Sequence, residues 1–221
     1  YSDYFPVVHA VGRVGLHLPA LLAGTQPFAD VCPRGVTPSA LARQIIGEAA
    51  SQRISESLCA QLTLAMQTRP AGQRVSILEI GNSQPLFADG LCHALDAASC
   101  DYIYATPSRA ALDEAARLQD RHPGLRTVLI EPAQPASGPA ADLILLHSDF
   151  DTPEAITHAL QYAHGNLKPG ATLMLLGAHP AAWLDFIFGA QQNWWTSDLD
   201  GGKVSTQYPL AYWQALLLQR G

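Results

Sequence analysis

The chain has 221 residues, enough for one large α/β domain or for a core with a small accessory lobe. Apolar residues make up 48% of the sequence and charged residues only 14%, so the chain can bury a full core while its surface carries less charge than usual. The formal net charge is −6, and no run of four or more basic residues occurs. A nucleic-acid partner is therefore not expected, because phosphate binding needs clustered cations.

The cysteines and the apolar runs further limit the class of protein that the sequence can encode. The four cysteines, Cys32, Cys59, Cys92 and Cys100, show no CxxC spacing and no histidine placed so as to suggest a zinc site, so we expect reduced thiols in a cytoplasmic protein and no metal site. No signal peptide is expected, and no apolar run reaches the ~20 residues that span a bilayer, so no membrane partner is expected. Since the chain begins at Tyr1 without an initiator Met, we expect it to be a piece of a longer polypeptide.

Residues 1–70 are predicted to form a helical lobe. Thr37-Pro38-Ser39 has the form of a helix cap followed by Pro at the first helical position. Apolar residues then recur at the three-to-four spacing of an amphipathic helix, at Leu41, Ile45, Ala49, Ile54, Leu58 and Leu62. The segment 68–72, with Pro and Gly, is predicted to separate this lobe from a core domain over residues 71–221.

From Val75 onward the pattern changes to short apolar runs that alternate with helical stretches. The expected strands are 76–81, 102–105, 127–130, 142–147 and 172–176, and the expected helices are 86–97, 109–119 and 153–166. Repeated strand–helix units with continuously apolar strands predict a mainly parallel sheet with helices on both faces. Such sheets bind ligands at the carboxyl ends of their strands.

A series of motifs runs along the chain in a fixed order. They are Leu18-Pro19-Ala20-Leu21-Leu22-Ala23-Gly24, Leu78-Glu79-Ile80-Gly81, Leu167-Lys168-Pro169-Gly170, Trp183-Leu184-Asp185-Phe186-Ile187-Phe188-Gly189, Trp194-Trp195, Tyr208-Pro209-Leu210 and Trp213. This succession resembles the C-methyltransferase domains of modular polyketide synthases, which use S-adenosylmethionine. The resemblance covers almost the whole chain and implies an α/β Rossmann-like methyltransferase fold with an N-terminal helical lid. Family members continue into further strands, so the core is expected to lack its last strands.

The resemblance also implies where the cofactor would bind, and there the sequence departs from the family. Members carry a G-x-G-x-G turn after the first strand, whose glycines let the backbone approach the cofactor. Here the turn reads Gly81-Asn82-Ser83-Gln84-Pro85. Gln84 adds a side chain where the cofactor should lie, and Pro85 removes an N–H donor. We expect this degenerate turn not to bind S-adenosylmethionine.

Two further contacts that the resemblance implies are missing. An acidic residue at the end of the second strand should accept the ribose hydroxyls, and the matching residue is Ala105. An Asp after the third strand should hold the adenine amine, and the best match is Ile130, although Glu131 beside it could substitute if the register slips. No cofactor is therefore expected.

The catalytic positions depart as well. The resemblance implies a His–Glu pair that removes a proton from the α-carbon of a β-ketoacyl substrate. Counting along the motifs places the His position on Asp151 and the Glu position on Leu176, and an Asp beside a Leu does not replace that pair. His147, four residues earlier at the end of a strand, is either a relocated base or a histidine bonded to backbone.

These losses predict a non-catalytic pseudo-methyltransferase domain with a structural role among the neighbouring domains of a polyketide synthase. One alternative is an active C-methyltransferase that acts on an acyl chain held by a carrier protein. Another is a docking module for the acyl carrier protein without chemistry of its own. The four tryptophans are expected to be core anchors, or else to line an acyl channel.

Overall fold

The computed structural model describes residues 4–33, 36–46, 48–67, 74–83, 85–95, 100–131, 140–150, 152–177, 180–197 and 202–220. The chain forms two compact units. The sheet unit consists of residues 49–150 and 154–176, and the terminal unit consists of residues 1–48, 151–153 and 177–221. The predicted boundary between a lid and a core at residue 70 stays a prediction of domain organisation, while compactness alone divides the chain near Glu48.

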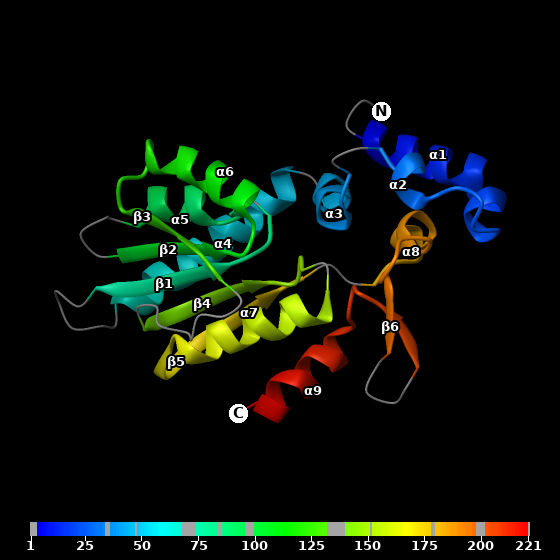
Figure 1. Cartoon of the computed structure of the whole chain (residues 1–221). Coiled ribbons are helices and arrows are strands. Elements are labelled where there is room, and N and C mark those ends of the chain that lie inside the picture. The colour runs from blue at the N-terminus through cyan, green and yellow to red at the C-terminus, as the bar shows by residue number, and fades with distance from the viewer. Residues whose placement is uncertain are drawn as a thin grey trace. The chain divides into compact units, whose positions relative to one another are not determined.

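The sheet unit is built on five parallel strands (Figure 1). They are β1 (Val75–Ile80), β2 (Cys100–Thr106), β3 (Leu125–Leu129), β4 (Ala141–His147) and β5 (Leu167–Leu176). Their order is β3-β2-β1-β4-β5, and every neighbouring pair is parallel. The predicted strands and the parallel α/β fold class are therefore confirmed. The order changes direction beside β1, so the carboxyl ends of β1, β2 and β4 lie together.

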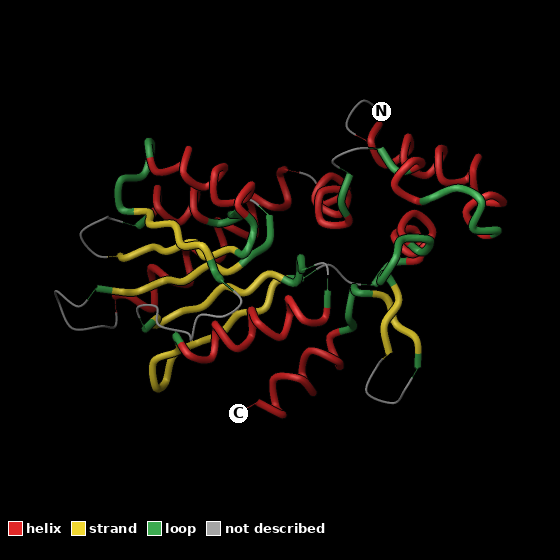
Figure 2. The backbone as a smooth tube through the Cα atoms, viewed as in Figure 1, coloured by secondary structure: helices red, strands yellow, loops and turns green. Residues whose placement is uncertain are grey.

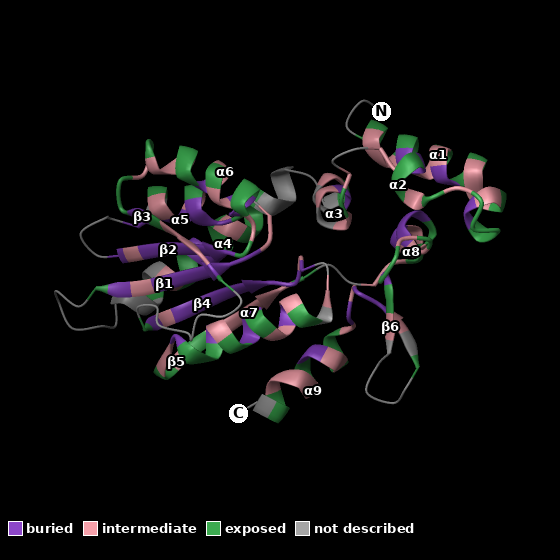
Figure 3. Cartoon of the chain, viewed as in Figure 1, coloured by how far each residue is buried: buried purple, intermediate pink, exposed green. Residues whose placement is uncertain are grey.

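Helices cover both faces of this sheet (Figures 1 and 2). They are α4 (Glu48–Gln67), α5 (Ala88–Ala94), α6 (Arg109–Gln119) and α7 (Pro153–Gly165). Helix α6 begins where it was predicted, because the Ser108 side chain accepts a hydrogen bond from the backbone N–H of Ala111 and so caps the helix. Strands β1, β2 and β4 are almost wholly buried, as Figure 3 shows. Their continuous apolar pattern reflects cover on both faces.

Strand β5 differs from its sequence-based prediction. The sequence predicted a strand over 172–176, after the motif Leu167-Lys168-Pro169-Gly170, but in the structure β5 begins at Leu167 and includes this motif. Gly170 has a φ of +76°, and the register with β4 shifts between Ala141 and Leu143, so the added part of the strand is irregular. Within the described residues β5 is an outer strand of this sheet and pairs with β4.

The terminal unit contains helices from both ends of the chain. These are α1 (Phe5–Leu22), α2 (Phe28–Val31), α3 (Pro38–Ile46), α8 (Ala182–Phe188) and α9 (Leu210–Arg220), with a hairpin of β6 (Trp195–Ser197) and β7 (Lys203–Ser205). The described part of residues 1–60 contains helices and no strand, as predicted. Helix α1 is long and apolar enough to cross a bilayer, a test that core helices and signal sequences also pass.

Tryptophans anchor the interior of the terminal unit. Trp194 is buried, stacks on Phe188 with ring centroids 5.3 Å apart, and donates its indole N–H to Asp185 Oδ1 over 3.0 Å. Trp213 is buried against Tyr208, and Trp183 packs at the margin of the same core as Trp194. Trp195 differs, since it is 44% exposed. Three of the four tryptophans thus serve as anchors within this unit.

The four cysteines carry free thiols. Burial raises the pKa of each, to about 12 for Cys92 and to about 11 for Cys100. These thiols therefore stay protonated and weakly nucleophilic near neutral pH.

Candidate functional site

Polar side chains gather at the carboxyl ends of β1, β2 and β4, where a parallel sheet would bind a ligand. Glu79 comes from β1, Tyr102 and Tyr104 from β2, and His147 from the end of β4. The two strands that flank β1 pair with it in register, Glu79 opposite Tyr104 on one side and Ile80 opposite Leu146 on the other. The sheet order thus brings together groups that lie up to 68 residues apart in the sequence.

Glu79 is the centre of this cluster and is fully buried. Its Oε1 accepts hydrogen bonds from the backbone N–H groups of Leu86, at 2.7 Å, and Phe87, at 3.2 Å. Its Oε2 accepts the hydroxyl of Tyr102 over 2.7 Å. Burial, and then the Glu79 carboxylate, raise the pKa of Tyr102 well above its ordinary value, so this phenol remains a donor. A buried carboxylate is tolerated here because several donors share its charge.

His147 completes the cluster. Its Nε2 lies 2.8 Å from Glu79 Oε1 and donates to that carboxylate, and the side chains of His147 and Glu79 are only 3% and 0% exposed. The ring meets Phe87 edge-on, and a Cβ added at Gly81 would come within 3.3 Å of it. A side chain at Gly81 would therefore require the His147 ring to shift by a few tenths of an ångström. Sequence reasoning left His147 as a relocated base or a backbone-bonded histidine and missed its carboxylate partner.

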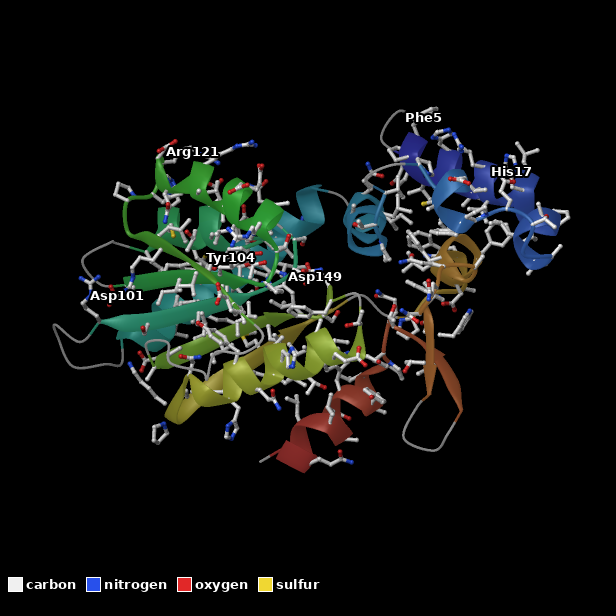
Figure 4. The ribbon with its side chains drawn as sticks, in the orientation of Figure 1. Phe5, His17, Asp101, Tyr104, Arg121 and Asp149 are labelled. Atoms are coloured by element: carbon white, nitrogen blue, oxygen red, sulfur yellow. The ribbon has the colours of Figure 1, made fainter. Side chains whose placement is uncertain are left out.

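The turn after β1 is held by a second carboxylate. Asp149, two residues beyond β4, accepts the backbone N–H of Asn82 on Oδ1 and that of Ser83 on Oδ2, both over 2.9 Å. Oδ2 also accepts the Ser83 hydroxyl. On the other side, the hydroxyl of the buried Tyr104 donates to the carbonyl of Ser83. Figure 4 shows Tyr104 and Asp149 at this end of the sheet.

Comparison with solved structures identifies the fold. No protein-family model matches the chain. The CurJ carbon methyltransferase superposes on all of the chain with a TM-score of 0.70 and 19% identity, and the methyltransferase domain of the citrinin polyketide synthase superposes on 98% with a TM-score of 0.71 and 17% identity. The DszA carbon methyltransferase gives 0.70 and 18% over 98%. The fold is that of a Rossmann-like methyltransferase.

The chain covers only part of the length of these proteins, and its sequence identity to its relatives is low. The chain spans about three fifths of the solved methyltransferases, 61% of CurJ and 59% of DszA and of the citrinin domain. The sequence of the chain is 26% identical over 130 residues to the highly reducing polyketide synthase pspA of Penicillium soppii. The matched stretch covers 54% of this chain and 5% of that synthase.

The structure places the residues predicted for the cofactor site at the carboxyl edge of this methyltransferase fold. Gly81 is buried, and its N–H bonds to the carbonyl of Ala105 over 3.2 Å. Ala105 is fully buried in β2. Ile130 directly follows β3, buried, with its N–H bonded to Thr106 O over 2.8 Å, while Glu131 beside it is exposed. Gln84 lies outside the described residues.

Of the two positions predicted for catalysis, the structure describes one. Leu176 ends β5 and pairs in register with His147, so the Glu position that the resemblance implies carries an aliphatic side chain beside the histidine. Asp151 lies outside the described residues. Within the part of the chain that the structure describes, no three His, Cys, Asp or Glu side chains are placed to hold a metal ion.

The chemistry open to the side chains at this edge depends on the hydrogen bonds that they already make. Both oxygens of Glu79 and both oxygens of Asp149 accept hydrogen bonds from the protein itself. A general base must reach the proton that it removes. His147 is buried, meets the ring of Phe87 edge-on and directs its Nε2 at the Glu79 carboxylate, so this nitrogen is already engaged within the protein.

Proposed function

We propose that this chain is a methyltransferase-type domain of a polyketide synthase that has a structural role and transfers no methyl group. The observation that carries the proposal is the internal occupation of the turn after β1. Asp149 takes the N–H groups of Asn82 and Ser83, and Glu79 takes those of Leu86 and Phe87. Donors that could bind a cofactor's polar groups are thus engaged by the protein's own carboxylates.

The contrast between core and site supports the same proposal. The sheet keeps five parallel strands with buried apolar side chains, and the terminal unit keeps its tryptophan anchors. The cofactor and catalytic positions instead carry Ala105, Ile130 and Leu176, none of which can accept or move a proton. A domain kept for its shape needs the first set of residues and not the second.

The partners that follow are the neighbouring domains of a cytoplasmic synthase, among them an acyl carrier protein. The similarity to pspA over 5% of its length fits a domain inside a much larger polypeptide. The domain would set the distance and orientation between catalytic neighbours.

Calorimetry with S-adenosylmethionine tests the proposal directly. Each missing hydrogen bond to a buried polar group costs about 1–3 kcal/mol, so two or three losses weaken a micromolar ligand to millimolar or beyond. We expect no binding with a dissociation constant below roughly 100 μM. S-adenosylhomocysteine serves as a second ligand without the sulfonium charge. Binding of either one below that limit contradicts the proposal.

A second test uses the intact synthase. Trp194→Ala removes a buried anchor at a cost of about 3–5 kcal/mol and should lower product yield, whereas Asp151→Ala should leave yield and product unchanged. If Asp151→Ala removes a methyl group from the product while the protein stays folded, the domain is an enzyme.

The active C-methyltransferase remains the second candidate, because His147 and Glu79 form a His–carboxylate pair 2.8 Å apart at the correct edge of the sheet. Methyl transfer to a carrier-bound β-ketoacyl chain is the assay that separates the two. The structural role predicts no transfer by the wild-type chain. The enzymatic role predicts transfer that His147→Gln abolishes while circular dichroism shows a folded protein.

A further inference from the structure

The turn after β1 has the geometry of an anion-binding site. The N–H groups of Asn82 and Ser83 are consecutive along the backbone, and each reaches a different oxygen of the same carboxylate over 2.9 Å. The Ser83 hydroxyl adds a third donor to Oδ2 of Asp149. Consecutive backbone N–H groups that converge in this way form a nest for a negative charge. The spacing of the donors matches a planar carboxylate, which offers two oxygens side by side.

The shape of this turn does not depend on Asp149 alone. Tyr104, fully buried in β2, donates its hydroxyl to the carbonyl of Ser83. The N–H of Gly81 bonds to the carbonyl of Ala105, and Glu79 holds the backbone at Leu86 just beyond the turn. Contacts on both sides therefore fix the two N–H groups in place. The nest should persist when the Asp149 carboxylate is taken away.

We infer that the turn is a carboxylate-binding site that the chain fills with its own Asp149, and that a small free carboxylate occupies it once this side chain is removed. Asp149, Asn82 and Ser83 are half-buried, so the site is open enough for formate or acetate to enter. The inference deepens the proposed function and rests on it, because an internal carboxylate leaves this turn liganded without a cofactor.

Chemical rescue of Asp149→Ala tests the inference. The variant should unfold at a lower urea concentration than wild type and should be restored by acetate or formate at constant ionic strength. Two or three donors to a small ion imply millimolar binding, roughly 1–100 mM. At ten times its dissociation constant, a carboxylate raises the ratio of folded to unfolded protein about tenfold. Chloride at the same ionic strength should have no such effect.

Asp142→Ala provides a matched control. Asp142 is also a half-buried aspartate, and its Oδ2 accepts hydrogen bonds from the backbone N–H of Ser76 over 2.9 Å and from Lys168 Nζ over 2.8 Å. These donors are one backbone N–H and an ammonium group instead of two consecutive backbone N–H groups, so acetate should not rescue its variant. The double variant Asp149→Ala/Ser83→Ala should need several-fold more acetate than Asp149→Ala, because the hydroxyl donor is gone.

Two measurements keep the inference separate from the proposed function. If Asp149→Ala does not fold, Asp149→Asn replaces it, and the amide proton signals of Asn82 and Ser83 should move on addition of acetate in that variant and not in wild type. Equal effects of acetate on wild type and variant, or no effect on either, overturn the inference. Tight binding of S-adenosylmethionine to wild type overturns the proposed function instead.

Discussion

The two ends of the parallel sheet both carry charged side chains, but they use them differently. At the amino end, Arg74 pairs with Asp101 at 2.8 Å and Lys168 pairs with Asp142 at 2.8 Å, and the side chains of Arg74 and Asp101 are 47% and 39% exposed. At the carboxyl end, Glu79 and His147 pair at the same distance with almost no exposure. Figure 4 places Asp101 and Asp149 at opposite ends of the sheet.

The exposed and the buried pairs have the same distance but should stabilise the folded protein by different amounts. Water screens an exposed pair, and holding two long side chains together costs entropy, so such a pair contributes at most about 1 kcal/mol. A buried carboxylate has lost its water and depends on the donors around it. Removing the carboxylate from such a buried cluster leaves the donors around it without their partner. The carboxyl end should thus respond strongly to substitution and the amino end weakly.

Glu79→Gln is the sharpest way to break this comparison. It removes the charge that His147, Tyr102 and two backbone N–H groups share, so we expect a loss of about 3–5 kcal/mol in the free energy of unfolding. Asp101→Asn is the matched change at the amino end and should cost less than about 1 kcal/mol. Urea unfolding measures both. Similar losses for the two variants would show that burial does not separate the two ends.

The sequence predicted the elements better than their connections. Strands β1 to β4 and helix α6 lie where the apolar runs and the helical spacing indicated, and β5 begins earlier than predicted, at Leu167. The pairing of Glu79 with His147 and the capture of the turn by Asp149 were not predicted. They depend on β4 lying beside β1, and hence on contacts between residues 66 to 68 positions apart. Local periodicity carries no information on strand order, so these partners follow only from the assembled sheet.

The candidate site could be predicted only in part, for the same reason. Each cofactor position could be compared with the family residue by residue, which identified Ala105, Ile130 and Leu176 as departures. Which of the chain's own groups bind the turn after β1 cannot be compared in that way. Asp149 follows the strand as an ordinary polar residue of a loop, and nothing in its neighbours marks it as the partner of a turn near residue 82.

Tyr102→Phe sharpens the comparison within the carboxyl end. It removes a hydrogen bond to the charged Glu79, so we expect a loss of about 1.5–3 kcal/mol. Tyr104→Phe removes a hydroxyl that donates to the neutral carbonyl of Ser83 and should cost about 1 kcal/mol. Both changes keep the aromatic ring, so packing is matched. A larger loss at Tyr104 than at Tyr102 would contradict the central place of Glu79.

The smallest expected effect is the pH dependence of the amino end. The hydrogen bond from Arg74 lowers the pKa of Asp101 below its usual value, so the folded state binds this proton less readily than the unfolded state. A depressed folded pKa stabilises the protein at a pH above the unfolded value of about 3.9, and the gain disappears as the pH falls through the folded pKa. Because both side chains are exposed, the gain is below about 1 kcal/mol. We expect wild type and Asp101→Asn to differ by this amount in urea unfolding from pH 7 to about pH 5, and to converge below about pH 4. A difference that grows towards low pH would mean that Asp101 is held in its protonated form, and the amino end would then resemble a buried site more than an exposed one.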